Sequence, residues 1–524
     1  MRTIRPWLQG GGLAMLYLLP PLGQFLSPAR RNLYHQLLPA TTLTRGLLID
    51  LLALGLVCSI AFLLLDRAAL RLKQFLWLPV FFAAAWIVTR DIADSISDPM
   101  LHGRMLRLTP YVPCVVLVVA AALLLFTPRV YHYCMRGAAV ILAAGGIAAL
   151  LVILPRLAMS SFSRMPQEQA GFTRPVSQTR QLGETRVVWI LFDELSYDQV
   201  FEHPQPGIVL PAFARFADQS VSFSQLSPVG YETERVIPSL LLGKPVADVK
   251  GDANGRMLLR HTDDSPWEHF DQDATIFAAA KRNGWGTGVA GWYNPYCRIL
   301  DNVLNRCYWT FAQSVAGVLF SRLSSRQSTW ENALDGLPLA ARFEGLWHQT
   351  PPNQALIDDY RNITNAGEAL IRDTDIRLAF IHMPVPHPPG LFPDPATHAP
   401  DYLGNLILAD QAMAQFFKSL ADSPAAANTV VIVSSDHSWR VPLWRGTTDW
   451  NNTEEHATNG GVFDQRPVLM VRFPQQTKPY RVDRPESEMI VHDLVLDLIE
   501  GKMRTPEEWL ASLSPAAPAV AQED

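Results

Sequence analysis

The stretch from Gly230 to Gly243, GYETERVIPSLLLG, carries a hydroxyl group where a nucleophile could act. A glycine-led loop places Thr233 just before an apolar run that ends at Gly243, a pattern typical of a short buried helix closed by a glycine cap. Free backbone N–H groups and the helix dipole make a helix N-terminus a good site for phosphate or sulfate. Threonine is also an ordinary N-cap residue, so a catalytic role requires a metal and acid–base groups from elsewhere in the chain.

Carboxylates and imidazoles follow three apolar runs of strand length: Asp193 and Glu194 after Arg186–Phe192, His382 and His387 after Arg377–Ile381, and Asp436 and His437 after Thr429–Ser434. The carboxyl ends of strands in an open α/β sheet gather functional groups at one edge. These oxygen and nitrogen donors suit Zn²⁺ or Mn²⁺. One further carboxylate and the Thr233 oxygen would complete a four-ligand site with Asp436 and His437.

The elements that must position these groups alternate between strand and helix. Two more strand-length runs are Gly288–Ala290 and Val468–Phe473, and the helical patterns are Pro211–Gln219, Ala274–Arg282, Asn353–Arg372, Tyr402–Ala421 and Glu488–Glu500. Alternation of this kind predicts an α/β domain with a mostly parallel sheet and flanking helices. We assign this domain to residues 186–505, a polar linker to 159–185 and a disordered tail to 506–524.

Residues 1–158 are predicted to form a helical transmembrane domain. Five apolar runs approach the length that crosses a bilayer, with four or six spans as alternatives: Trp7–Leu26, Gly46–Leu65, Phe75–Thr89, Val112–Phe126 and Ala138–Leu154. The first run could instead be a signal peptide, but four further runs follow it and no typical cleavage site is seen. Arginines and lysines flank the runs on both sides, so charge does not decide the orientation.

The composition is apolar for a soluble protein. Of the 524 residues 48% are hydrophobic and only 18% charged, and the net charge of −5 argues against a nucleic-acid partner. Cys297 and Cys307 lie ten residues apart in the α/β part, where they form either a disulfide in an oxidising compartment or two unrelated buried thiols.

Together these motifs resemble the sulfatase branch of the alkaline phosphatase superfamily. The features are a strand followed by Asp193, a loop threonine, the sequence H-x-x-x-x-H-P ending at His387, and a strand followed by Ser-Asp-His. Five spans before such a domain are similar to membrane-bound phosphoethanolamine transferases and lipoteichoic acid synthases. The resemblance covers roughly residues 186–500.

The resemblance implies a role for each matching residue. Asp193, Thr233, Asp436 and His437 would bind one divalent metal, Zn²⁺ or Mn²⁺, with Thr233 also the nucleophile. His387 would contact the substrate phosphate or leaving group and act in acid–base catalysis. His456 would be a further substrate-binding histidine, and His382 is expected to be structural. Glu194 is an alternative to Asp193 as ligand, because related enzymes differ in which of two adjacent acids binds.

The departures from the family concern the substrate. Sulfatases carry a cysteine or serine that is oxidised to formylglycine, and Thr233 cannot be converted in this way, so sulfate-ester hydrolysis is disfavoured. The transferases usually have glycine where Ser438 follows Asp-His, and many carry several disulfides in the soluble domain.

The expected function is therefore metal-dependent transfer of a phospho-headgroup, phosphoethanolamine or phosphoglycerol, from a phospholipid to a glycan or lipid acceptor through a phospho-threonine intermediate. The alternatives are a phosphodiester hydrolase with the same site and a non-catalytic membrane sensor or scaffold. The resemblance also implies a multi-pass protein of the bacterial inner membrane, with its soluble domain facing the periplasm or exterior.

Overall fold

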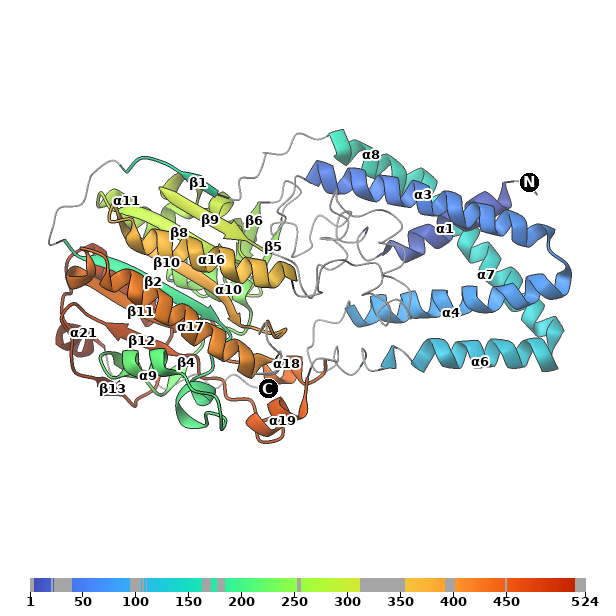
Figure 1. Ribbon diagram of the computed structural model, residues 1–524. Coiled ribbons are helices and arrows are strands. Elements are labelled where there is room, and N and C mark those ends of the chain that lie inside the picture. The colour runs from blue at the N-terminus through green and yellow to red at the C-terminus, as the bar shows by residue number, and fades with distance from the viewer. Residues whose placement is uncertain are drawn as a thin grey trace.

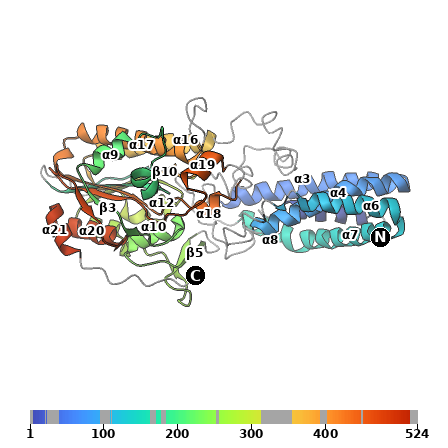
Figure 2. The same cartoon turned by 90° about the horizontal axis from the view of Figure 1, so that it is seen from below.

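The computed structural model describes residues 4–19, 22, 40–94, 105, 108–109, 111–162, 171–176, 184–251, 256–311, 354–391, 401–447 and 450–513. Helices make up one end of the molecule and an α/β domain the other (Figure 1; Figure 2).

The N-terminal part consists of long helices that overlap the five predicted apolar runs. They are α1 (Arg5–Tyr17), α3 (Ala40–Arg67), α4 (Leu70–Asp94), α6 (Tyr111–Phe126), α7 (Pro128–Ala148) and α8 (Leu154–Phe162), the last two joined by a π-helical segment at Ala149–Ile153. The backbones of α1 and α7 touch: a Cβ added at Gly12 would lie 1.8 Å from the carbonyl oxygen of Leu142. Residues 20, 21 and 23–26 of the first predicted run lie outside the described residues.

Two stretches of the described chain, Leu70–Thr89 and Pro128–Ala158, are long and apolar enough to cross a membrane. Core helices of soluble proteins pass the same test, so the five-span bundle stays a prediction. Exposed large apolar side chains are concentrated in this part of the molecule. Among the described residues, all of them except Val209 and Val462 lie between Ile4 and Val152.

The α/β domain is built on a nine-stranded sheet in the order β1-β9-β8-β10-β2-β11-β12-β3-β13. Its strands are β1 (Gly171–Thr173), β2 (Arg186–Asp193), β3 (Val221–Phe223), β8 (Gly286–Trp292), β9 (Arg306–Thr310), β10 (Ile376–Pro386), β11 (Thr429–Ser435), β12 (Leu469–Arg472) and β13 (Tyr480–Val482). Strands β9, β8, β10, β2 and β11 run parallel to one another. Strand β13 is also parallel to β3, whereas β12 is antiparallel to both β11 and β3, and β1 is antiparallel to β9. The sheet is therefore mixed, but most of its pairings are parallel, as predicted.

Helices cover both faces of the sheet, and β2 is buried along its whole length. Alternate side chains of β2 enter two different cores: Trp189 packs in one and Ile190 in the other. The Trp189 core contains residues of α10 (Thr233–Leu242), α11 (Ile276–Arg282), α20 (Ile490–Ile499) and α21 (Pro506–Ser512). The Ile190 core contains residues of α9 (Pro211–Ala217), α16 (Gln354–Arg372) and α17 (Tyr402–Ala421). Between its first and last residues, the sequence of β2 is apolar without interruption because both faces of the strand are buried.

Two predicted boundaries need correction. The first part of the tail predicted over 506–524 is a helix, α21 (Pro506–Ser512), which starts with a capping box between Thr505 and Glu508 and buries Trp509. Residues 514–524 of that tail lie outside the described residues. The predicted linker contributes β1, which pairs with β9 at the edge of the sheet.

The remaining elements are small. A three-stranded antiparallel sheet comprises β5 (Asp248–Gly251), β6 (Met257–Arg260) and β7 (Glu268–His269), and β4 (Leu226–Ser227) pairs with β14 (Glu486–Ser487). Short helices α12 (Tyr296–Ile299), α18 (Val441–Trp444) and α19 (Asn452–Ala457) follow the strand ends.

Candidate active site

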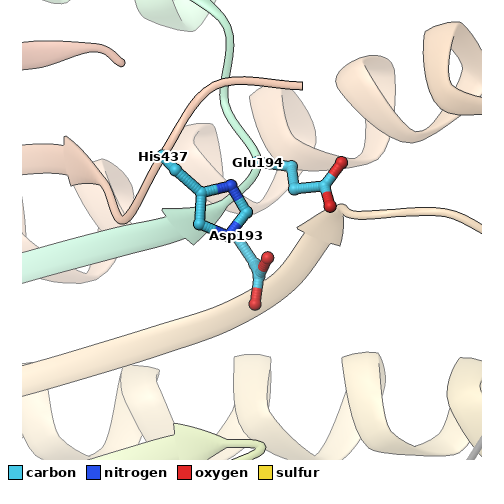
Figure 3. Close-up of side chains that lie close together, drawn as sticks. All are labelled: Asp193, Glu194 and His437. Atoms are coloured by element: carbon cyan, nitrogen blue, oxygen red, sulfur yellow. The ribbon is translucent and has the colours of Figure 1, made fainter. Parts of the chain in front are cut away.

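The site lies where two neighbouring central strands end. Strands β2 and β11 are parallel, with Ser435 in register with Phe192, so the residues that follow them reach the same edge of the sheet. Asp193 ends β2, and Asp436 and His437 come directly after β11. All three side chains are completely buried. Figure 3 shows the Asp193 carboxylate beside the His437 ring, with the Glu194 carboxylate turned away from both.

Thr233 enters this group as the first residue of α10. The helix ends, as predicted, at Gly243, which has the left-handed φ of 69° that glycine tolerates. The Oγ1 atom of Thr233 lies 2.7 Å from Asp436 Oδ2, 3.3 Å from Asp193 Oδ2 and 3.4 Å from His437 Nε2. The structure therefore brings the four predicted ligands together around one point.

The donor set fits a tetrahedral metal ion. With bonds of about 2.0–2.1 Å, the ligand atoms of tetrahedral zinc lie roughly 3.3 Å apart. The separations of Thr233 Oγ1 from Asp193 Oδ2 and His437 Nε2, 3.3 and 3.4 Å, are close to that value, as is the 3.1 Å between Asp436 Oδ2 and His437 Nε2. The 2.7 Å between Thr233 Oγ1 and Asp436 Oδ2 is shorter and is a hydrogen bond. In addition, Asp193 Oδ1 is buried and has no hydrogen-bond partner, which is costly for a carboxylate unless a cation binds there.

The charges of the site are strongly coupled. Burial by itself would raise the pKa of Asp436, but the neighbouring imidazole of His437, with contributions from His382 and Thr233, outweighs burial and lowers the pKa. Burial would likewise lower the pKa of His437, and Asp436 reverses this and raises it. Asp436 is therefore a carboxylate at neutral pH, as a metal ligand must be.

Glu194 has a different set of partners. Its backbone adopts a positive φ of 63°, and its carboxylate accepts hydrogen bonds from Arg440 Nε at 2.6 Å and Trp444 Nε1 at 2.9 Å. Burial by itself would raise the pKa of Glu194, but the Arg440 guanidinium, together with His387, His437 and the hydrogen bond from Trp444, outweighs burial and lowers it. Glu194, Asp193 and His437 offer ligand atoms within 4.8 Å of one another. Since Arg440 and Trp444 already bind Glu194, the geometry favours Asp193 as the ligand.

His387 lies at the mouth of the site, whereas His456 does not. The His387 ring lies between Trp292 and Trp444, with ring centroids 5.2 and 5.1 Å away, and its Nε2 is 3.2 Å from Arg440 Nη2. His456 is exposed on α19. No hydrogen bond or ion pair joins His456 to the four clustered ligands in the described part of the chain.

Sequence reasoning missed two residues of the site, and a third lies nearer to it than the sequence indicated. His382, expected to be structural, is completely buried with Nε2 3.4 Å from Asp193 Oδ2, and its Nδ1 is 2.8 Å from the Tyr296 hydroxyl. Tyr296 and Arg440 were not singled out. The sequence gives little indication of either residue. Arg440, for example, stands three residues beyond His437, and only the folded chain brings it back to Glu194.

The two cysteines of the α/β domain are bonded to each other. The disulfide Cys297–Cys307 joins α12 to β9, which resolves the two alternatives left open by their spacing. It anchors the segment that carries Tyr296.

Comparison with known families agrees with this geometry. The sulfatase family profile matches residues 185–499, more than half of the chain. The chain belongs to the sulfatase family. The match begins at β2 and ends with α20, so it includes all four clustered ligands. A search of curated proteins found no match.

Solved structures of similar fold have low sequence identity to this member of the sulfatase family. Ps i-CgsB in complex with k-i-k-neocarrahexaose is 14% identical, with 62% of this chain and 74% of that chain covered and a TM-score of 0.41. The phosphonate monoester hydrolase of Agrobacterium radiobacter is 14% identical, with 60% and 74% covered and a TM-score of 0.38. The phosphonate monoester hydrolase SpPMH from Silicibacter pomeroyi is 15% identical, with 64% and 78% covered and a TM-score of 0.40.

Proposed function

We propose that this protein is a membrane-bound, metal-dependent transferase that moves a phospho-headgroup from a phospholipid to a glycan or lipid acceptor. The observation that carries the proposal is the position of Thr233. Its hydroxyl stands at the N-terminus of a ten-residue helix, within 3.4 Å of two buried carboxylates and a buried imidazole. A hydroxyl in this setting is suited to attack a phosphorus atom.

Asp193, Thr233, Asp436 and His437 would hold the metal, which supplies positive charge that lowers the pKa of the hydroxyl and offsets charge on the phosphoryl oxygens. Thr233 Oγ1 attacks the phosphorus and gives up its proton, the bond to the diacylglycerol oxygen breaks, and diacylglycerol leaves with one proton, so that the step balances. The headgroup phosphate stays on Thr233 until an acceptor hydroxyl displaces it. The hydrogen bond from Thr233 to Asp436 Oδ2, 2.7 Å long, orients the hydroxyl for the first step.

Two features support a lipid donor. The exposed large apolar side chains lie almost entirely on the N-terminal helices, which suits contact with lipid. In both views α18 and α19 lie at the end of the α/β domain nearest these helices (Figure 1; Figure 2), and Trp444 of α18 binds Glu194 beside the site. An active site at that end would be close to a phospholipid substrate.

The test is mass spectrometry of Thr233 after incubation of the purified full-length chain with phospholipid and metal. We expect a headgroup phosphate on the peptide that contains Thr233, with an equivalent release of diacylglycerol. Thr233→Ser should retain part of the activity because the hydroxyl remains, and Thr233→Ala should lose about 10⁴-fold or more because no covalent intermediate forms.

The fate of the adduct distinguishes a transferase from a hydrolase. In a transferase the adduct persists in water and clears when an acceptor is added. Release of headgroup phosphate at full rate without an acceptor would make the protein a hydrolase. An unmodified Thr233 in a protein that binds metal would argue for the sensor or scaffold.

A further inference from the structure

The contact between His387 and Arg440 determines which nitrogen of the histidine carries its proton. Arg440 Nη2 lies 3.2 Å from His387 Nε2. A guanidinium has only donors and keeps its charge in proteins, so it cannot accept a hydrogen bond from the ring. His387 Nε2 must therefore be the acceptor, and the ring proton of the neutral imidazole is on Nδ1.

The surroundings hold the ring in this orientation. Trp292 and Trp444 pack against it edge-on, with interplanar angles of 62° and 84°. Arg440 is itself fixed, because it pairs with Glu194 and donates from Nη1 to the backbone oxygen of Tyr231 at 3.3 Å. Neither the histidine nor its donor is free to turn.

The His387 side chain is 13% exposed, and its Nδ1 has no hydrogen-bond partner among the described residues. The backbone oxygen of Tyr231 that Arg440 contacts lies two residues before Thr233, so the same guanidinium reaches the nucleophile loop and the histidine. A neutral N–H donor is thereby held at the mouth of the site.

We propose that His387 acts as a neutral Nδ1–H donor to a phosphoryl or leaving-group oxygen, and that Arg440 is the positioning residue that enforces this tautomer. This inference rests on the proposed function for the identity of the substrate oxygen. It also changes the role predicted from the sequence: His387 stabilises charge through a hydrogen bond instead of delivering a proton as an imidazolium.

The tautomer can be measured without any substrate. We would label the full-length chain with ¹⁵N-histidine and record the two ring nitrogens of His387 by NMR at neutral pH, assigning the signal by its loss in His387→Asn. The expected result is a protonated Nδ1 and an unprotonated Nε2, in contrast to the exposed control His456, which should show a mixture. A protonated Nε2 on His387, alone or in an imidazolium, would overturn the proposal.

Activity variants test the same point independently. An asparagine amide nitrogen occupies the place of Nδ1, and a glutamine amide nitrogen the place of Nε2. His387→Gln and His387→Ala should therefore lose about 10²–10³-fold in kcat, as for removal of one charge-stabilising donor, and His387→Asn should lose clearly less than His387→Gln. Glutamine performing as well as asparagine or better contradicts the assignment.

Arg440→Met tests the positioning residue. Loss of the guanidinium should convert His387 to a tautomer mixture, and a histidine that stays protonated on Nδ1 alone would mean that Arg440 does not enforce the tautomer. If this variant fails to fold, the wild-type spectrum still decides the proposal. A protein with the expected tautomer but no transfer activity would refute the proposed function and leave this inference standing.

Discussion

At the scale of single residues, the two adjacent acids at the end of β2, Asp193 and Glu194, have different roles. Asp193 has a buried oxygen without a partner and lies 3.3 Å from Thr233 Oγ1. Glu194 is bound by Arg440 and Trp444. The sequence alone could not distinguish them, because both follow the strand and both are carboxylates. The difference comes from the left-handed backbone of Glu194, which turns its side chain away from Asp193.

This division predicts opposite results for two conservative variants. Asp193→Asn should lose most of the bound metal and leave the free energy of unfolding of the metal-free protein nearly unchanged. Glu194→Gln should keep the metal but destabilise the fold by about 3–5 kcal/mol, because Arg440 is then a buried charge without its partner. Metal content by mass spectrometry and urea denaturation of both metal-free proteins provide the measurements.

A matched control is available on the surface. Glu455 pairs with Arg445 where both side chains are well exposed, and Glu455→Gln should change the stability by about 1 kcal/mol or less. If Glu194→Gln loses the metal while Asp193→Asn keeps it, the ligand assignment is reversed.

At the scale of elements, the regular parts of the α/β domain were predictable and its edges were not. The run RVVWILF is a strand because both faces of β2 are buried, and α17 spans the same residues, Tyr402–Ala421, as the predicted helix. The edge strands β1 and β13, and β3 beside β13, have three residues each, too few to show a period. Their pairing depends on contacts distant in sequence, which also make the sheet mixed.

The candidate site, like the fold, was predictable only in part. Asp193, Thr233, Asp436 and His437 stand in a recognisable order along the chain, and the structure brings them together. The positions of Arg440 and Tyr296 depend on how α18 and α12 fold back from the strand ends. The path of such connecting segments cannot be predicted from a pattern in the sequence.

One connection between elements should make stability depend on pH. Glu488, just before α20, is completely buried, and its carboxyl accepts a hydrogen bond from the backbone N–H of Val229 in the segment leading to Thr233. Burial raises the pKa of Glu488 well above its ordinary value of 4.5. The folded protein therefore holds a proton that the unfolded chain releases, and stability falls as the pH rises above about 4.5 towards the raised pKa.

Glu488→Gln removes this titration and keeps an oxygen for Val229. The variant should be less sensitive than wild type to a rise from pH 5 to pH 8, measured by urea denaturation of the metal-free protein at each pH. Asp497→Asn on the outer side of α20 is the control and should leave the wild-type slope intact. A wild-type stability that rises faster than that of Glu488→Gln over this range would show that the carboxyl is ionised in the fold.

At the scale of the whole molecule, the chain consists of an apolar helical part followed by an α/β domain of the sulfatase family. The exposed large apolar side chains up to Val152 would be unfavourable in water, and each buried one stabilises by roughly 1.5–3 kcal/mol when it leaves water. The α/β domain exposes only Val209 and Val462 among its described large apolar residues. This asymmetry is the physical reason to expect that the first part lies in a bilayer and the second outside it.

The final prediction concerns the location of the two parts. Expressed in bacteria, the full-length chain should stay in the membrane fraction after an alkaline carbonate wash that releases peripheral proteins, and Thr233→Ala should behave identically because the site has no part in anchoring. If the α/β domain is exported, Cys297 and Cys307 should resist a thiol reagent in unreduced cells, since disulfides persist in oxidising compartments. After denaturation, the same reagent should label the unpaired Cys58, Cys114 and Cys134. A chain released by the wash would refute the membrane anchor, and labelling of Cys297 and Cys307 without reduction would place the α/β domain in the cytoplasm. Either result would remove the basis for a lipid donor on the outer face.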